Sequence, residues 1–164
     1  MTDRLIHFSN ELLDRDSLVV RDQDNFKPRG LWFSCEGGRE DGWADWCVSE
    51  RFRTEDLVCA TEVFLRPDAR TLHMSTHAEI LEFTSEYATC RHRIHLREID
   101  WSRVAKDWQV VMITPYVWSA RMDMRCWWYY SWDVASGCVI DPAAIDRLEP
   151  VEWAVPVQNR EAAE

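Results

Sequence analysis

The segment Thr71–Tyr87, TLHMSTHAEILEFTSEY, decides the fold class because it joins a strand to a helix at a clear boundary. Its first four residues, 71–74, are strand-like and follow a turn signal at residues 66–68. Thr76 and Glu79 have the spacing of a capping box, which predicts a helix that begins directly after Thr76. Apolar residues then recur with the helical period, at Ile80, Phe83 and Tyr87.

The sequence on either side of this segment predicts more strands than helices. Asp41 is a candidate N-cap for a helix to about residue 52, which carries Trp43, Trp46 and Cys47 on one face, and Asp100 for a helix to Lys106. Because helices and strands do not alternate regularly, we expect an α+β fold with a mixed or antiparallel sheet and a few short helices. The predicted strands cover residues 5–8, 30–34, 57–65, 109–114, 138–141 and 149–153, with a short helical turn at 142–145.

Length and composition favour one globular domain. The chain has 164 residues, of which 46% are hydrophobic and 29% charged. We expect a single domain over residues 1–157 and a flexible tail over 158–164. No run of about 18 apolar residues and no signal-peptide pattern occur, so we expect no membrane partner and a cytoplasmic location.

Charge and cysteine usage limit the partners and cofactors. The net charge of -10 repels phosphate backbones, and the basic stretch at residues 91–97 is followed at once by Glu98 and Asp100. We therefore expect no nucleic-acid partner. The six cysteines form no CxxC pair, so reduced thiols and no bound metal are expected. His73 and His77 lie four residues apart, but the capping box places them on different elements, which argues against a shared metal.

Glycine-dependent motifs are absent. With only five glycines, the chain has no GxGxxG, no P-loop and no GxSxG. Dinucleotide binding of the Rossmann type and Walker-type phosphate binding are therefore disfavoured.

Tryptophan is the unusual component, with ten in the chain. Trp32 and Trp43 are separated by ten residues, so one can lie on a strand and the other on the next helix, flanking one flat ligand group. The run 127–133, WWYYSWD, predicts by strand alternation that Trp128, Tyr130 and Trp132 share one face. This run can be core packing, a groove wall or an exposed partner-binding face.

Three segments together resemble the ADP-ribosyltransferase superfamily, in its His-Tyr-Glu branch of diphtheria-toxin and poly-ADP-ribose-polymerase type. They are a strand histidine at His7, the block Gly30–Ser34 and the closing stretch Ser136–Pro142. The block GLWFS is similar to the polymerases' Gly-Leu-Tyr-Phe-Ala, and Trp46–Cys47 is an alternative match to their helical Tyr-Cys. The segment 27–32, KPRGLW, is also similar to uncharacterised small proteins of phages and prophages.

The resemblance implies an NAD-dependent mono-ADP-ribosyltransferase-like protein, a transferase of a glycosyl group, that acts on an unknown host macromolecule. It implies that His7 binds the ribose and that Trp32 and Trp43 hold the nicotinamide, with Ser34 and Trp46 also in the cofactor site. The position that matches the catalytic glutamate is Gly137, so catalysis would need another acid. Asp133 and Asp141 are the two candidates.

A different class of function also fits the sequence. A non-catalytic protein-binding module, of a phage accessory or anti-defence type, would use the tryptophan-rich face to bind a host protein. The two hypotheses differ in whether His7 or the aromatic run carries the activity.

Overall fold

The computed structural model describes residues 4–37, 42–89 and 98–153. Over these residues the protein is α+β, with a seven-stranded sheet in the order β4-β7-β8-β2-β1-β3-β9. Neighbouring strands are antiparallel except for β4 and β7, which run parallel. The strands are β1 (Arg4–Ser9), β2 (Leu31–Glu36), β3 (Cys59–Leu65), β4 (Thr71–Met74), β7 (Val110–Ile113), β8 (Ser136–Val139) and β9 (Ile145–Val151), and a separate small pair joins β5 (Ala88–Thr89) to β6 (Glu98–Ile99).

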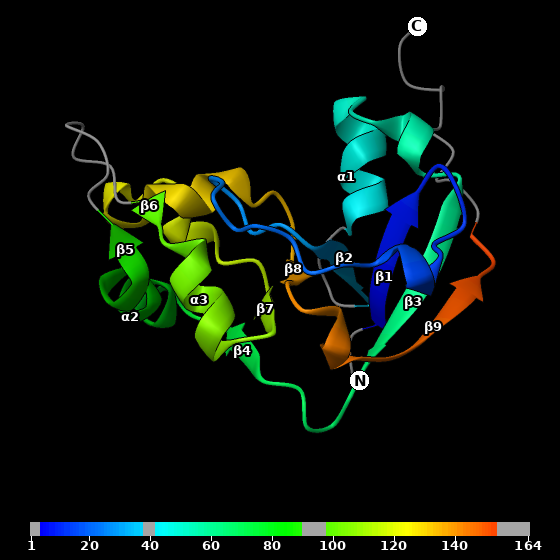
Figure 1. Ribbon diagram of the computed structural model, residues 1–164. Coiled ribbons are helices and arrows are strands. Elements are labelled where there is room, and N and C mark those ends of the chain that lie inside the picture. Colours follow the sequence, from blue (N-terminus) through cyan, green and yellow to red (C-terminus); the bar gives the residue numbers. More distant parts are fainter. Residues whose placement is uncertain (1–3, 38–41, 90–97, 154–164) are drawn as a thin grey trace, which may run out of the picture.

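The helices lie at the two ends of the sheet (Figure 1). Helices α2 and α3 gather with the 3-10 helices η3 and η4 around β4 and β7, whereas α1 stands beside β1 and β3. The α-helices are α1 (Trp43–Glu50), α2 (His77–Tyr87) and α3 (Trp101–Asp107), and the 3-10 helices are η1 (Arg15–Ser17), η2 (Thr54–Asp56), η3 (Trp118–Ala120), η4 (Met124–Ser131) and η5 (Pro142–Ala144). Among the described residues, no helix combines the length and the apolar character needed to cross a bilayer.

Two of the predicted helix starts are confirmed by their caps. Thr76 and Glu79 form the reciprocal capping box at the start of α2, and the Asp100 side chain accepts a hydrogen bond from the Arg103 N–H at the start of α3. Helix α1 has Gly42 as its N-cap, and the expected cap Asp41 lies outside the described residues. The basic stretch 91–97 and the tail 158–164 also lie outside them.

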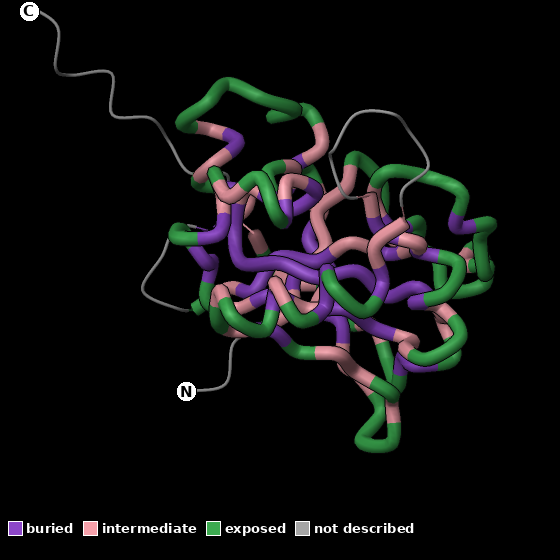
Figure 2. Tube along the Cα trace, turned by 90° about the vertical axis from the view of Figure 1, so that its left-hand side faces the viewer, coloured by how far each residue is buried: buried purple, intermediate pink, exposed green. Residues whose placement is uncertain are grey.

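A large aromatic and aliphatic cluster forms the main core. Trp101, Trp128, Tyr129 and Trp132 are buried in it together with Ile80 of α2. Figure 2 shows the buried residues concentrated along the strands through the middle of the molecule, with exposed segments around them. A second, smaller cluster of Ala44, Cys47 and Leu57 holds α1 against the other end of the sheet. The described cysteines are all free thiols, as expected for a reduced protein.

The prediction that residues 127–133 alternate as a strand is wrong. Most of the run belongs to the 3-10 helix η4, in which Trp128 and Tyr129 are both buried although they are adjacent. Tyr130 is 43% exposed and stacks on Trp127 with a centroid distance of 4.6 Å, as expected for residues three apart in a 3-10 helix. The run is therefore mainly core, because a helical turn can bury Trp128, Tyr129 and Trp132 together whereas strand alternation cannot.

Candidate functional site

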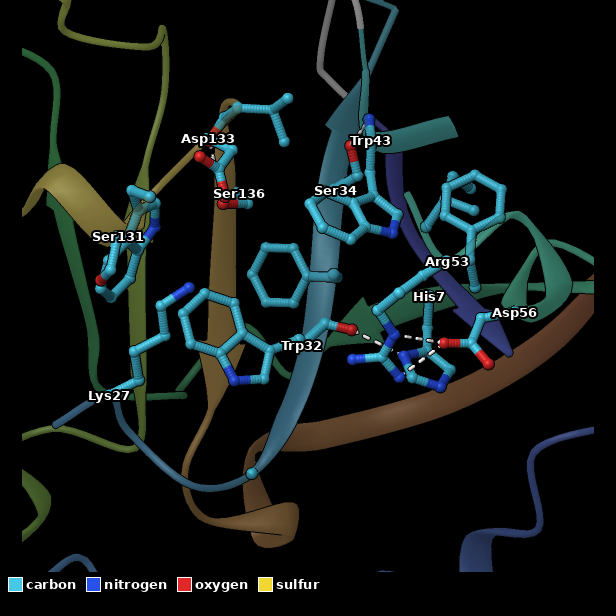
Figure 3. A pocket seen from close by; sticks show the side chains of 16 residues that line it. His7, Lys27, Trp32, Ser34, Trp43, Arg53, Asp56, Ser131, Asp133 and Ser136 are labelled. Carbon is cyan, nitrogen blue, oxygen red and sulfur yellow. Dashed lines mark hydrogen bonds and ion pairs between the residues drawn. The ribbon is translucent and has the colours of Figure 1, made fainter. Parts of the chain in front are cut away.

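A pocket of ≈ 390 Å³ opens between β1, β2, the start of α1 and the chain between η4 and β8 (Figure 3). Its volume lies in the usual range for small-molecule sites. Trp32 forms the middle of its wall, with Lys27 on one side and His7 on the other. The polar groups that line it come from Lys27, Ser131, Asp133 and Ser136 and from His7, Ser34, Arg53 and Asp56.

Strand β2 presents the pocket wall because its side chains alternate between two faces. Leu31 and Cys35 pack into the main core, whereas Trp32 and Ser34 line the pocket. The Trp32 indole N–H donates to the Pro28 carbonyl at 3.2 Å, and its ring lies against Trp132 at 4.8 Å between centroids. The polar edge of Trp32 is therefore satisfied within the protein, and its ring lines the pocket between Trp132 and Lys27.

Ser34 fixes the second tryptophan of the pocket. Its hydroxyl accepts a hydrogen bond from the Trp43 backbone N–H at 3.0 Å, which joins β2 to the first residue of α1. Trp43 lines the pocket and stacks on Trp46 with centroids 5.1 Å apart and planes inclined by 16°. Trp46 thus supports Trp43 from behind and does not itself line the pocket.

Glu36 places a carboxyl group at the N-terminus of α1. A Cβ atom at the N-cap Gly42 would overlap the Glu36 carboxylate, so this side chain would have to move if Gly42 were replaced. Burial raises the pKa of Glu36, while the Ser34 hydroxyl opposes that shift. The N-terminus of α1 favours the ionised carboxylate and burial opposes it, and Glu36 packs against the start of this helix.

His7 is held as a neutral imidazole. Its Nδ1 lies 2.7 Å from the Trp32 carbonyl oxygen, which can only accept a hydrogen bond, so Nδ1 carries the proton. Burial lowers the pKa of His7, and the hydrogen bond to Trp32 only partly offsets this. The neutral ring therefore has Nε2 as its free acceptor at the pocket wall.

Lys27 and Asp133 line the side of the pocket that lies away from His7. The Lys27 ammonium lies 5.3 Å from the centroid of Trp32 and 6.0 Å from that of Trp132, which is cation-π geometry. Burial lowers the pKa of Lys27, and the nearby Asp133 carboxylate opposes that shift. Asp133 also lies 3.5 Å from the Arg121 guanidinium, a loose pairing.

An ion pair closes the wall next to His7. The Arg53 guanidinium contacts the Asp56 carboxylate at 2.5 Å, which spans η2 and the residue before it. Arg53 has a positive φ of 47°, a conformation that costs a non-glycine residue some strain. The pair leaves this side of the pocket with balanced charge.

The structure brings together five of the seven residues singled out from the sequence. His7, Trp32, Ser34, Trp43 and Asp133 all line the pocket. Trp46 lies behind it, and Asp141 lies elsewhere: its carboxylate accepts from the Gln109 amide at 2.9 Å and from the Ala143 N–H at the start of η5. Of the two candidate acids, only Asp133 reaches the pocket.

Sequence reasoning missed the two pocket cations and Asp56. Lys27 lies three residues before Gly30, close to the Gly30–Ser34 block, but residues 27–29 indicated only a turn. Arg53 and Asp56 lie in a surface segment with no motif, and the packing of η2 against α1 brings them to the pocket.

Gly137 is the position that the resemblance to ADP-ribosyltransferases matches to a catalytic glutamate. Atoms of neighbouring strands fill the space that a side chain would need there. It pairs with Phe33 of β2 on one side and with Met112 of β7 on the other. A Cβ atom at Gly137 would lie 2.6 Å from the Val111 carbonyl oxygen and would collide with the Phe33 ring. No carboxylate can therefore extend from this position.

Comparison of the chain with protein-family models, with curated proteins and with solved structures gives no match. The chemistry has to be inferred from the pocket itself. Two indole faces, a neutral histidine acceptor and one loosely paired carboxylate suit a flat ring attached to a hydroxylated group. Lys27 adds a cation for an anionic portion of the same ligand, whereas Arg53 is already paired with Asp56.

Proposed function

We propose that this protein binds NAD in the pocket and is an ADP-ribosyltransferase-like protein acting on a host macromolecule. The observation that carries the proposal is that His7, Trp32, Trp43 and Asp133, which lie far apart in the sequence, line one pocket. The nicotinamide ribose end fits a cavity of ≈ 390 Å³, and the adenosine end extends from its mouth.

Pocket residues are assigned to the nicotinamide, the ribose and the diphosphate of NAD. Trp32 and Trp43 hold the positively charged nicotinamide ring against their electron-rich faces, a favourable cation-π arrangement. Nε2 of the neutral His7 accepts a hydrogen bond from a ribose hydroxyl. Lys27 leaves its place over the Trp32 ring and pairs with the diphosphate, to which an ammonium group is well suited.

Asp133 is the acid that stabilises the transition state. When the bond between nicotinamide and ribose breaks, positive charge develops on the sugar, and a nearby carboxylate stabilises that charge more than it stabilises the ground state. Nicotinamide leaves with the bonding electron pair, and a nucleophilic group of the acceptor adds to the sugar carbon and loses its proton. Asp133 takes this role because Gly137 cannot carry an acid.

The first test measures thermal unfolding with and without NAD. A ligand at about a hundred times its Kd adds about 2.7 kcal/mol, which should raise Tm by about 5–10 °C for a chain of this size. We expect the shift in wild type and in His73→Ala, an exposed histidine on β4, and its loss in His7→Ala. The absence of any shift in wild type at millimolar NAD would reject the proposal.

Release of nicotinamide from NAD tests the catalytic step. Asp133→Asn keeps the size of the side chain and removes the charge, so we expect it to retain the thermal shift and to lose turnover. Equal turnover in wild type and Asp133→Asn would exclude this carboxylate from catalysis.

A second candidate function is protein binding without catalysis, through a different surface from the one first expected. Trp128 and Trp132 are each 1% exposed and cannot contact a partner. Trp118, Met122 and Met124 are 67%, 68% and 58% exposed within one short segment. Large apolar side chains exposed in this way are typical of interaction sites. Capture of one stoichiometric host protein that is lost in Trp118→Ala and kept in His7→Ala would favour this function.

A further inference from the structure

Three side chains of different chemistry meet where α2 begins, outside the pocket. They are His77, the first residue of α2, and Asp123 and Cys126, which lie at the N-cap and in the first turn of η4. A ring nitrogen of His77, a carboxylate oxygen of Asp123 and Sγ of Cys126 all lie within 4.8 Å of one another. None of the three lines the NAD pocket.

We infer that His77, Asp123 and Cys126 bind a borderline divalent transition-metal ion, for which Zn²⁺ is the first probe. Imidazole, carboxylate and thiolate are the ligands that Zn²⁺ prefers, whereas a thiolate disfavours Mg²⁺ and Ca²⁺. Three protein ligands leave the fourth tetrahedral position to water or to a group of a bound molecule.

The local geometry comes close to a tetrahedral site. With metal-ligand bonds of about 2.0 Å to nitrogen and oxygen and about 2.3 Å to sulfur, neighbouring ligand atoms should lie about 3.5 Å apart. His77 Nε2 and Asp123 Oδ2 are 2.9 Å apart, and the third atom lies within 4.8 Å of both. Shifts of about 1 Å would bring the three ligand atoms to these distances.

The backbone already orders two of the ligands. Asp123 accepts hydrogen bonds from the Arg125 N–H and caps η4, which fixes its carboxylate toward the α2 side. Cys126 is fully buried three residues later, and its Sγ contacts the Ala120 carbonyl at 3.6 Å. The third ligand comes from α2, which the hydrogen bond between Trp128 and Thr84 holds against η4 at 2.7 Å.

Arg125 is the competitor for the metal. Its guanidinium lies 2.6 Å from the Asp123 carboxylate, but the Arg125 side chain is 68% exposed and can move into solvent. When the ion binds, it replaces this contact and the proton of the Cys126 thiol passes to solvent. The ion would then join the start of α2 to η4 across the surface of the main core.

The experiment uses Co²⁺ as a spectroscopic probe for the Zn²⁺ site. The full chain is first treated with a chelator and dialysed, and Co²⁺ is then titrated while absorption is recorded. We expect binding of one ion per chain with a thiolate-to-cobalt charge-transfer band, which Zn²⁺ displaces and Mg²⁺ does not. No band at Co²⁺ concentrations up to the millimolar range would overturn the inference.

Matched variants assign the band to these residues. Cys126→Ser and His77→Ala should lose it, whereas Cys138→Ser and His73→Ala should keep it; Cys138 is also fully buried with Sγ near a carbonyl oxygen. A band that persists in folded Cys126→Ser would overturn the assignment. If Cys126→Ser does not fold, Arg125→Ala provides the second test. Removing the exposed Arg125 side chain frees the Asp123 carboxylate from its ion pair and should tighten Co²⁺ binding roughly two- to fivefold. Unchanged or weaker binding in Arg125→Ala would contradict the site.

Discussion

Replacing Gly137 by alanine is expected to lower the free energy of unfolding by about 3 kcal/mol. The added Cβ atom would lie 2.6 Å from the Val111 carbonyl oxygen, well inside ordinary contact distance, and would also meet the Phe33 ring. Strand β8 lies between β7 and β2 near the middle of the sheet, so it cannot move away from either neighbour. A loss of about 3 kcal/mol corresponds to a fall in Tm of about 6–12 °C at this chain length.

Urea unfolding followed by far-UV circular dichroism measures this change, together with a thermal melt. Gly37→Ala is the matched control, since it has a positive φ of 97° and nothing within 4 Å of its added Cβ. It should cost only about 1 kcal/mol, from backbone strain alone. A Gly137→Ala variant as stable as wild type, or no less stable than Gly37→Ala, would refute the reasoning that this position has no room for a side chain.

A double-mutant cycle separates the effect of the Phe33 ring on this cost from that of the Val111 carbonyl. In a Phe33→Leu background the ring is gone but the Val111 carbonyl remains, so Gly137→Ala should cost less than in wild type and still more than zero. Equal costs in both backgrounds would show that the ring does not limit the space.

Three further predictions concern pH, capping and the second candidate acid. Folding lowers the pKa of His7, so the neutral ring contributes its full stability above the ordinary pKa of 6.5 and this contribution is lost as the pH falls through the pKa of the folded state. Urea unfolding across this range should show a shallower pH dependence of stability in His7→Gln than in wild type. Thr76→Ala removes the hydrogen bond to the Glu79 N–H and should cost about 1 kcal/mol, measured by the same urea titration, whereas no loss would mean that the capping box does not stabilise α2. Asp141→Ala should lower Tm, because it removes the bond from Gln109, and should leave the NAD-induced shift unchanged; loss of that shift would place Asp141 in the binding site after all.

Short sequence patterns predicted where helices begin, whereas the order of the strands depends on contacts between distant parts of the chain. The capping box at Thr76 and the cap at Asp100 depend on neighbouring residues only, so the starts of α2 and α3 could be read from the sequence. Strand order depends on which faces pack together, and no short sequence pattern predicts the parallel pairing of β4 with β7. The aromatic run 127–133 was assigned the wrong period because all its side chains except Ser131 and Asp133 are large aromatic rings that can be buried in either conformation.

The candidate site was predictable in part for a similar reason. Trp32 and Ser34 share one face of a strand, and Trp43 follows on the next helix, so a local pattern could place them near one another. Lys27, Arg53 and Asp56 reach the pocket only through the packing of irregular segments. The cluster of His77, Asp123 and Cys126 was missed because its members come from segments far apart in the chain, and the sequence pattern instead drew His77 toward His73.

The contact between Trp32 and Trp132 makes the interior an optical reporter of the pocket. Trp132 lies 4.8 Å from Trp32, 5.4 Å from Trp128 and 6.1 Å from Trp101, measured between ring centroids, so a continuous series of indoles runs from the pocket wall into the core. Excitation energy absorbed by any of these rings can pass between them at such short range. A ligand that quenches Trp32 therefore also dims the fluorescence of the buried indoles, and occupancy of the pocket can be followed without any label.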